Sequence, residues 1–337
     1  MNPVAPARAG RGWLVRLPNY VGDTVCALPA LHGLAAHGPL IAFGRPWAIP
    51  LLAAAGIEAL AYPRELRARV DVLRTAARRH GLQHLLLLTH SFSSALDARL
   101  AGLRPTGYAK DARRWLLAGN AGPLPDGHLV EVYERLAACA LAEDGIRPVS
   151  AALPANARPA WTPPWPGPNA DPAGLAAARQ RLAIALGDDR RPYAVLVPRA
   201  GGAHAGASKD WPALGTLPTL LQQAGLRVLM APGPGESAAF AAAAPAAECL
   251  DGLGLVDFGL LAAGARLVIA PDSGQAHLAA AAGAPVLAVF GPTAPARCRP
   301  WSPRVEVLGG NGQWPSPATV EAAILRRLAS SDPTNSC

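Results

Sequence analysis

Lysine, aromatic residues and charged residues in general are scarce in this sequence. Aromatic residues make up 5% and charged residues 16% of its 337 positions, and lysine supplies only two of the 31 basic residues, Lys110 and Lys209. The five cysteines lie far apart, with no CxxC pair and no Cys/His pair at metal-ligand spacing. They are Cys26, Cys139, Cys249, Cys298 and Cys337. This pattern argues against a zinc site and a disulfide framework, and it fits a reducing compartment.

Long hydrophobic segments are missing as well. The first apolar stretch, 13–17, contains Arg16, and the next is interrupted by Asp23, so no signal-peptide core forms. An uncharged apolar run at 278–290 has 13 residues and includes Pro285, whereas a membrane-spanning helix needs about 20 residues. We therefore expect a cytoplasmic protein, and any contact with a membrane should be peripheral.

The length predicts two domains, at roughly 150 residues for each. Residues 151–172 contain seven prolines, which resist both helix and sheet and are typical of a linker. We predict an N-terminal domain at 1–155, a proline-rich linker at 156–172 and a C-terminal domain at 173–330.

Short apolar runs alternate with alanine-rich stretches in each half, which is typical of βαβ units. Strands are expected at 13–17, 40–43, 85–89, 193–197, 227–231, 267–270 and 286–290. Helices are expected at 24–36, 65–80, 211–224, 236–244, 275–282 and 318–328, with Ser316 as the N-cap of the last. The expected fold is α/β, with two doubly wound domains facing across a cleft and ligands at the carboxyl ends of the strands.

The first motif that suggests chemistry is Arg16-Leu-Pro-Asn-Tyr-Val-Gly22-Asp23. It follows a predicted strand, and we expect Gly22 to permit a tight turn before a helix that begins near Asp23. Asp23 is either a helix N-cap or a carboxylate at the mouth of the cleft, suited to act as a general base. The turn lacks the G-x-G-x-x-G spacing of dinucleotide-binding folds, which argues against an NAD enzyme.

The second motif is a loop of small residues at 198–208 that ends in Ser208-Lys209-Asp210-Trp211-Pro212. Such a loop lets backbone N–H groups approach an anion, although it is also typical of a flexible surface loop. Because nearly every other basic residue is arginine, Lys209 indicates a need for a compact point charge. The Walker spacing is absent.

The third motif, Asp272-Ser273-Gly274-Gln275-Ala276-His277, follows the predicted strand at 267–270. Asp272, Ser273 and Gly274 are expected at a helix N-terminus, where N–H groups and the helix dipole favour a phosphate. A capped helix with a half-buried histidine is the alternative. Glu236, after another predicted strand, is equally consistent with a helix cap and a ligand for hydroxyl groups.

In this order, the three motifs resemble glycosyltransferase family 9, the lipopolysaccharide heptosyltransferases. The family's strand and Gly-Asp turn is matched at 18–23, its Lys-x-Trp-Pro at 209–212, and its Asp-Ser-Gly-x-x-His-Leu-Ala at 272–279, with Pro285–Thr293 following. Residues 89–95, Gly107-Tyr108 and Arg113-Arg114 are similar to the heptosyltransferase II branch.

The resemblance implies a GT-B fold and an inverting transfer of heptose from ADP-heptose to an inner-core acceptor of the heptose-Kdo-lipid A type, with no cofactor and no metal. It implies that Asp23 is the general base and that Lys209 holds the leaving diphosphate, both as catalytic residues. Residues implied to bind the donor are Gly22, Ser208, Glu236, Asp272, Ser273, Gly274 and His277. Those implied to bind the acceptor are Ser91, Arg113 and Arg114.

Basic residues are concentrated in the first half. Residues 1–160 contain 18 Lys and Arg against 11 Asp and Glu, whereas residues 161–337 contain 13 against 12. Six of these arginines lie within 64–79, which is usually a solvated face. An excess of positive charge would also attract the acidic glycolipid acceptor and the cytoplasmic face of the inner membrane. Nucleic acid is not expected, because aromatic residues do not interleave with the arginines.

Two other functions remain open from the sequence. One is a family 9 transferase that uses another nucleotide sugar or a protein acceptor, since the fold alone does not fix the substrate. The other is a nucleotide-binding module without catalytic activity. Turnover of a panel of nucleotide sugars separates the three.

Overall fold

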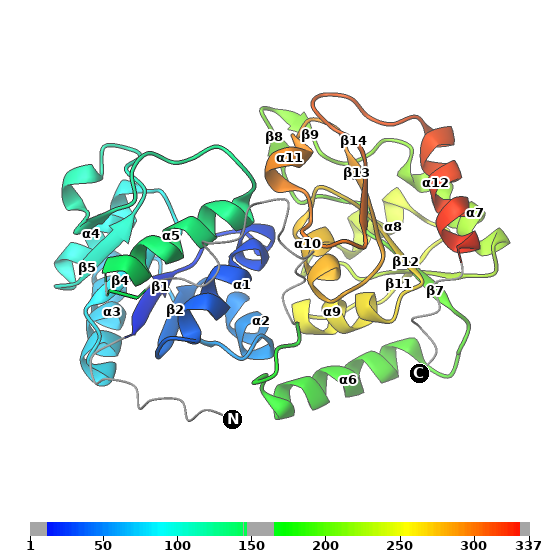
Figure 1. The fold of residues 1–337 in the computed structure, drawn as a ribbon. Coiled ribbons are helices and arrows are strands. Elements are labelled where there is room, and N and C mark those ends of the chain that lie inside the picture. The colour runs from blue at the N-terminus through cyan, green and yellow to red at the C-terminus, as the bar shows by residue number, and fades with distance from the viewer. Residues whose placement is uncertain (1–11, 144, 147–164, 331–337) are drawn as a thin grey trace. The chain divides into compact units, whose positions relative to one another are not determined.

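The structure, a computed structural model, describes residues 12–143, 145–146 and 165–330 (Figure 1). The chain divides into two compact units, Met1–Pro159 with Pro166–Asp171 and Ala160–Trp165 with Pro172–Cys337. The predicted linker lies outside the described residues up to position 164. Beyond that point, Trp165 is buried and a helix begins at Pro172.

The first unit contains a six-stranded parallel sheet with the strand order β3-β2-β1-β4-β5-β6. Its strands are β1 (Trp13–Arg16), β2 (Leu40–Gly44), β3 (Glu58–Ala61), β4 (His84–Leu87), β5 (Arg104–Gly107) and β6 (Gly119–Asn120). Its helices are α1 (Val21–Ala35), α2 (Ala48–Ala54), α3 (Leu66–His80), α4 (Phe92–Leu100) and α5 (Leu129–Glu143), with a 3₁₀ turn, η1 (Arg114–Leu116).

Helices cover both faces of this sheet, which explains why its central strands are apolar on both sides. Leu14, Phe43 and Leu87 lie in one buried cluster with Val70 and Leu73 of α3. On the opposite side, α1 and α5 pack against each other along their lengths. Because successive side chains of a strand alternate between faces, the buried residues from Trp13 to Val15 pack against the helices on both sides of the sheet.

The second unit repeats the same topology, with the parallel strand order β11-β10-β7-β12-β13-β14. Its strands are β7 (Tyr193–Leu196), β10 (Arg227–Met230), β11 (Glu248–Cys249), β12 (Leu267–Pro271), β13 (Val286–Phe290) and β14 (Val305–Gly309). A separate hairpin pairs β8 (Ala203–His204) with β9 (Ala207–Ser208). Its helices are α6 (Pro172–Leu186), α7 (Leu217–Gln223), α8 (Ser237–Ala243), α9 (Leu255–Ala263), α10 (Gly274–Ala281), α11 (Pro295–Cys298) and α12 (Pro317–Ala329), with a 3₁₀ turn, η3 (Leu214–Thr216).

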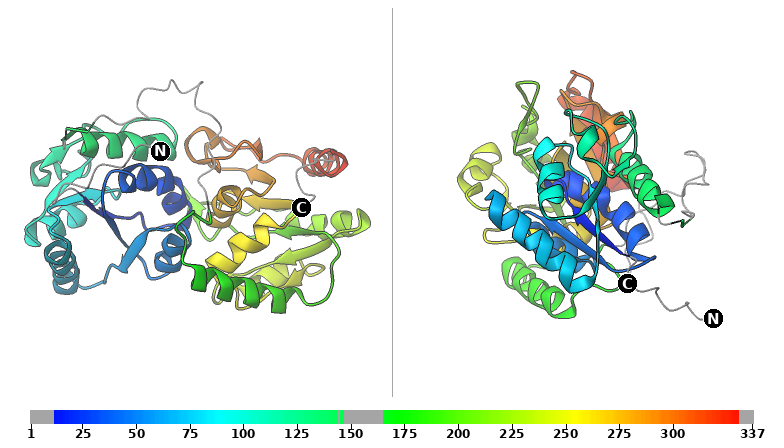
Figure 2. Two further views of the ribbon diagram at one scale, coloured as in Figure 1. Left: turned by 60° about the horizontal axis from the view of Figure 1, so that its bottom comes forward. Right: turned by 90° about the vertical axis from the view of Figure 1, so that its left-hand side faces the viewer.

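Two layers of helices enclose the second sheet. Leu217 of α7, Phe240 of α8 and Ile324 of α12 share one buried cluster with strand residues such as Leu196 and Ile269. On the other side, α9 packs between α6 and α10, and Figure 2 shows α6 running beside α9. The strand order of both sheets is that of the doubly wound Rossmann topology, which confirms the predicted α/β class.

Most predicted elements are confirmed within a few residues at each end, and β13 has the predicted bounds. Ser316 caps α12 as predicted, since its side chain accepts a hydrogen bond from the Thr319 N–H. For the helix predicted at 211–224, the predicted first residue is wrong. The chain forms the turn η3 first, and α7 begins only at Leu217, with Pro218 in its first turn. Proline lacks an N–H group and cannot extend a helix from the preceding turn.

All helices in the described ranges are too short or too polar to cross a membrane.

One titratable group inside the first unit makes its stability depend on pH. Burial lowers the pKa of His32, in the last turn of α1, below its usual 6.5. The unfolded chain therefore takes up a proton on this side chain before the folded chain does, so stability is full above pH 6.5 and falls as the pH decreases below it. We expect the urea midpoint of His32→Gln to fall less between pH 7.5 and pH 5.5 than that of the wild type. Equal falls would contradict this assignment.

Candidate active site

The strand order reverses at one point in each sheet, and the residues singled out in the sequence follow the strands at these points. In the first unit β1 and β4 are neighbours at the reversal, and in the second unit β7 and β12 are. Ligands of open α/β sheets bind beyond the carboxyl ends of such strand pairs. Asp23 follows β1 and Ser91 follows β4, whereas Lys209 follows β7 and Asp272 follows β12. Each unit therefore has its own candidate site.

In the second unit, three predicted residues come together around one carboxylate. The Lys209 Nζ lies 3.4 Å from Asp272 Oδ2, and the His277 Nε2 lies 4.0 Å from Asp272 Oδ1. The Asp272 residue is 8% exposed and the Lys209 side chain 19% exposed, so this ion pair is only partly screened by water. Segments 63 residues apart in the sequence thus join in one cluster, as the sequence predicts.

The cluster lies at the N-terminus of α10. Ser273 is the N-cap, and its Oγ accepts a hydrogen bond from the Ala276 N–H at 3.2 Å. The His277 N–H bonds to the Ser273 carbonyl at 3.4 Å. Within the described part of the chain this leaves the first N–H groups, those of Gly274 and Gln275, available for an anion. The structure thus confirms the capped helix, with His277 buried at 5% exposure, and binding of a phosphate at this N-terminus stays a prediction.

The loop before Lys209 is a built hairpin rather than an open loop. Strands β8 and β9 pair through a two-residue turn in which Ala205 and Gly206 have φ angles of 49° and 82°. Asp210 joins the two ends of the hairpin loop, because its Oδ1 accepts the Ala200 N–H at 2.7 Å and its Oδ2 lies 3.6 Å from Arg199. These contacts hold the loop in place, with Lys209 directed toward Asp272. Ser208 is exposed, and its Oγ accepts the Asp210 N–H at 3.1 Å, so in this structure it supports the hairpin.

Glu236 stabilises its own loop. It is the N-cap residue of α8, and its carboxylate accepts the Gly233 N–H at 2.9 Å, which closes the loop after β10. The neighbouring contact that links this loop to the cluster comes from Gln275, whose side chain donates to the Ala231 carbonyl at 2.8 Å. The sequence indicated Glu236 but gave no reason to select Gln275.

Asp210 and Cys298 are two residues near the cluster that were not selected from the sequence. The Cys298 Sγ lies 3.9 Å from Asp272 Oδ2 and 3.4 Å from the Ala294 carbonyl. Cys298 belongs to α11, beyond β13, and no spacing relates it to Asp272. Asp210 could have been found, since an Asp side chain in a loop commonly accepts hydrogen bonds from nearby backbone N–H groups.

In the first unit, the motif from Arg16 to Asp23 differs from the prediction in its local structure. The helix begins at Val21 with Tyr20 as N-cap, so Asp23 is not the N-cap. Gly22 is buried inside the first turn of α1 and forms no tight turn. Asp23 is half-buried at the third helical position, where the helix dipole favours a negative charge. A carboxylate presented by a helix is held more rigidly than one on a turn.

A buried arginine orders the segment that leads to Asp23. Arg16 is 7% exposed, and its guanidinium donates to the carbonyls of Leu17 and Phe43 and, at 2.7 Å, to Asn19 Oδ1. It also stacks on the Tyr62 ring, 4.2 Å from the centroid. Because these groups lie at the ends of β1 and β2, Arg16 fixes the backbone directly before α1.

One arginine of the basic segment 64–79 is not available to a ligand. The Arg69 Nε and the Tyr62 hydroxyl both donate to Asp97 Oδ2 at 2.7 Å, and Asp97 is 1% exposed. Arg69 therefore balances a buried carboxylate, because an unpaired charge there would be costly. The prediction that the arginines of 64–79 form a solvated face is therefore wrong for Arg69.

The three predicted acceptor residues have different positions. Ser91 is the exposed N-cap of α4, and Arg114 is exposed in η1. Arg113 is fully buried at 0% exposure, and it donates to the carbonyls of Tyr108 (2.9 Å), Thr89 (2.7 Å) and Ser91 (3.3 Å). Burial lowers the pKa of Arg113 to about 10. Direct contact of Arg113 with an acceptor is therefore contradicted by this structure, in which the side chain positions the segment from Thr89 to Ser91.

We expect Arg113→Met to lower the free energy of unfolding by about 1.5–3 kcal/mol, because carbonyl groups that bond to a buried cation lose their donor. Arg114→Met is the matched control, since it removes the same charge from an exposed neighbour. Urea unfolding of both variants checks this. Equal midpoints for the two would contradict the positioning role.

The described residues contain no group of three or more His, Cys, Asp or Glu side chains arranged to hold a metal ion.

Two Rossmann-type units, each with polar residues beyond the strands at its reversal point, are the components of the GT-B fold of glycosyltransferases. The sequence model of glycosyltransferase family 9 (heptosyltransferase) matches residues 73–328. The chain therefore belongs to this family.

Solved structures agree with the assignment of the fold. The chain is similar to the ADP-heptose lipopolysaccharide heptosyltransferase II of E. coli, with 24% identity, a TM-score of 0.72, and coverage of 94% of this chain and 98% of that one. It is also similar to E. coli heptosyltransferase WaaC with ADP, with 20% identity, a TM-score of 0.66, and coverage of 94% and 100%. A family 9 glycosyltransferase of Veillonella parvula has 15% identity, a TM-score of 0.70, and coverage of 94% and 91%. Comparison with curated protein sequences finds no match.

Proposed function

We propose that this chain is an inverting glycosyltransferase that moves heptose from ADP-heptose to the inner core of lipopolysaccharide, with an acceptor of the heptose-Kdo-lipid A type. The observation that supports it most is the cluster of Lys209, Asp272 and His277 at the N-terminus of α10, in a chain of family 9. A cation beside helical N–H groups suits a diphosphate. The similar E. coli structures are an ADP-heptose lipopolysaccharide heptosyltransferase II and WaaC with ADP.

In the proposed reaction Asp23 is the general base. Its carboxylate accepts the proton of the attacking acceptor hydroxyl, and the hydroxyl oxygen forms a bond to the anomeric carbon of the heptose. The bond from that carbon to the diphosphate oxygen breaks at the same time, and ADP leaves with the electron pair. Attack opposite the leaving group inverts the anomeric configuration.

In this proposal the second unit stabilises the leaving group. Negative charge develops on the diphosphate as its bond to the heptose breaks, and fixed positive groups lower the energy of that transition state. Lys209 supplies a point charge, and the N–H groups of Gly274 and Gln275 supply donors. Lys209 thus takes the place that a metal ion has in metal-assisted transfer, so we propose that the reaction needs no metal and no cofactor. Gly22, Ser208 and Glu236 remain predictions as donor contacts.

The first unit is proposed to bind the acceptor. Exposed Ser91 and Arg114 lie on segments after β4 and β5, and the excess of basic residues in the first half would attract an acidic glycolipid. The same charge supports a peripheral contact with the cytoplasmic face of the inner membrane.

A panel of nucleotide sugars tests the proposal. With a heptose-Kdo-lipid A acceptor and EDTA present, ADP-heptose should release its nucleotide, and UDP-glucose and GDP-mannose should not. Turnover of only another nucleotide sugar would contradict the proposed donor and favour a different family 9 transferase. Binding of ADP without turnover of any donor would contradict catalysis altogether.

A further inference from the structure

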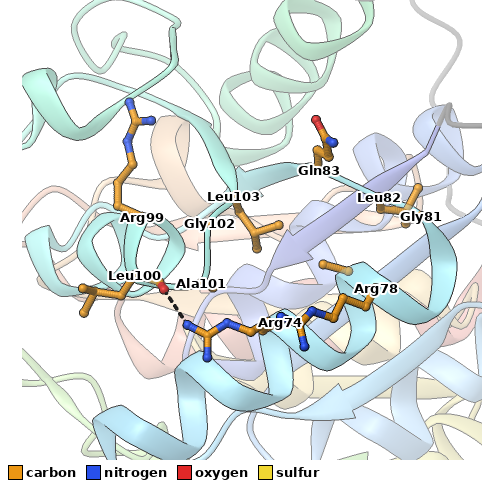
Figure 3. A pocket seen from close by; sticks show the side chains of 11 residues that line it. Arg74, Arg78, Gly81, Leu82, Gln83, Arg99, Leu100, Ala101, Gly102 and Leu103 are labelled. Carbon is orange, nitrogen blue, oxygen red and sulfur yellow. Dashed lines mark hydrogen bonds between the residues drawn. The ribbon is translucent and has the colours of Figure 1, made fainter.

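A pocket of about 530 Å³ lies in the first unit, between the C-terminal ends of α3 and α4 (Figure 3). Gln83 and Leu103, which directly precede β4 and β5, form part of its lining. The pocket is therefore at the amino-terminal edge of the sheet. Asp23 and Ser91 follow carboxyl ends of strands at the opposite edge, so the pocket is separate from the candidate acceptor site. Its volume is in the range of small-molecule sites.

The lining is positively charged and includes no acidic residue. Three of its eleven residues are arginines, Arg74, Arg78 and Arg99, and none of the eleven is acidic. Figure 3 shows Arg74 and Arg78 side by side on α3, whereas Arg99 lies on α4 with its guanidinium directed away from them. Arg74 and Arg78 thus supply the contacts, and Arg99 adds positive potential from the opposite wall.

The contacts of the two arginines leave donors for a ligand. Arg74 is held in place, because its Nη2 donates to the Leu100 carbonyl at 2.8 Å, and a 3.4 Å ion pair joins it to exposed Asp71. The Arg78 side chain is exposed and makes no hydrogen bond or ion pair with other described residues. One guanidinium is therefore preorganised, and the other is free to turn toward an anion.

Helix stabilisation does not fully account for this pair. Arg78, Arg79 and His80 already place positive charge in the last turn of α3, where it offsets the helix dipole. Arg74 lies one turn earlier, and two like charges four residues apart on a helix repel each other and destabilise it. An anion between the two guanidinium groups would remove that repulsion.

The rest of the lining indicates what kind of anion fits. Leu82 and Leu103 line the pocket but are only 2% and 4% exposed, so its apolar surface comes mainly from half-buried Ala77 and from Leu100 at the rim, which is 47% exposed. Gly81 is the C-cap of α3, and Gly102 follows Ala101, the C-cap of α4. Their φ angles are 66° and 79°, and a Cβ built on either glycine would meet nothing within 4 Å. The entrance is therefore open, and the pocket combines a cationic part with an apolar part.

We propose that this pocket binds a phosphate group attached to an organic molecule, with the phosphate between Arg74 and Arg78 and the organic part against the apolar lining. Guanidinium groups bind phosphate oxygens through paired N–H donors. The same chemistry is present in a soluble phosphomonoester and in the headgroup of an anionic phospholipid. The inference is independent of the transfer reaction, since neither ligand is a nucleotide sugar or an acceptor.

Two binding measurements distinguish the two sources of phosphate. The first is calorimetric titration of the full chain with glycerol 3-phosphate, and the second is sedimentation with phosphatidylglycerol vesicles, with phosphatidylcholine vesicles as reference. Binding of glycerol 3-phosphate supports a soluble ligand, and binding only to phosphatidylglycerol vesicles supports a lipid headgroup.

Arg78→Gln should weaken whichever binding is seen by about tenfold, the loss expected for one charge-assisted contact. Because Arg78 makes no contact that the fold needs, this variant should unfold at the wild-type temperature. Arg79→Gln is the matched control: it removes the same charge from the next residue, outside the pocket, and should bind as the wild type does. The proposal is overturned if neither probe binds, or if both variants weaken binding equally.

Discussion

Replacement of Asp23 by Asn is expected to lower turnover by about 10²–10⁴-fold, the usual contribution of a positioned general base. The amide has nearly the same shape as the carboxylate but cannot accept the proton of the attacking hydroxyl. Asp23 lies half-buried in the first turn of α1, on a segment that Arg16 holds through three oxygen acceptors. The substitution therefore changes the chemistry and leaves the backbone in place.

Steady-state kinetics of Asp23→Asn should show the loss in kcat, with the KM for ADP-heptose close to the wild-type value. Asp71→Asn is the matched control, because this carboxylate is exposed on α3 of the same unit, and its turnover should not change. Turnover of Asp23→Asn near that of the wild type would contradict the assignment of the base.

Lys209→Ala is the second substitution with a large expected effect. It should lower turnover by about 10²–10³-fold, as expected for loss of one preorganised group that stabilises charge in the transition state. It also leaves Asp272, 8% exposed, without its nearest cation, so a carboxylate close to the proposed diphosphate site is no longer neutralised. The lost positive charge and the unneutralised carboxylate both raise the energy of the transition state in which the diphosphate leaves.

Binding of ADP to Lys209→Ala, measured by calorimetry, should weaken together with turnover. Lys209→Arg should recover only part of the activity, because a planar guanidinium does not replace a compact ammonium group in a fixed hairpin. Arg190→Ala removes an exposed cation from the same unit and should behave as the wild type does. Unchanged ADP affinity and turnover in Lys209→Ala would contradict its role.

The parts of the fold that the sequence predicted best are those where local and tertiary signals agree. The strand at 286–290 has its predicted bounds because five buried apolar residues are flanked by Pro285 and Gly291. The start of α10 was predictable because Ser273 is a strong N-cap residue after a buried strand. The cluster of Lys209 and Asp272 then follows from the strand order, since β7 and β12 are neighbours.

Other features depend on contacts that no local pattern contains. The family resemblance implied that Arg113 contacts the acceptor. The carbonyl groups of Thr89 and Ser91 need a buried donor, however, and Arg113 supplies it. The hairpin of β8 and β9 has strands of only two residues, too short to show alternation. Cys298 is 26 residues from Asp272 in the sequence, and the course of the chain through β13 and α11 brings the two side chains together. Such contacts are set by the tertiary fold.

The most direct test of the central claim is the mass of the acceptor after incubation with ADP-heptose and the purified chain. We expect heptose-Kdo-lipid A to gain the mass of one heptosyl residue, with inverted anomeric configuration in the product, and Asp23→Asn to form little product in the same time. An acceptor whose mass does not change while ADP-heptose is bound or hydrolysed, or an acceptor that gains a different sugar, would contradict the account.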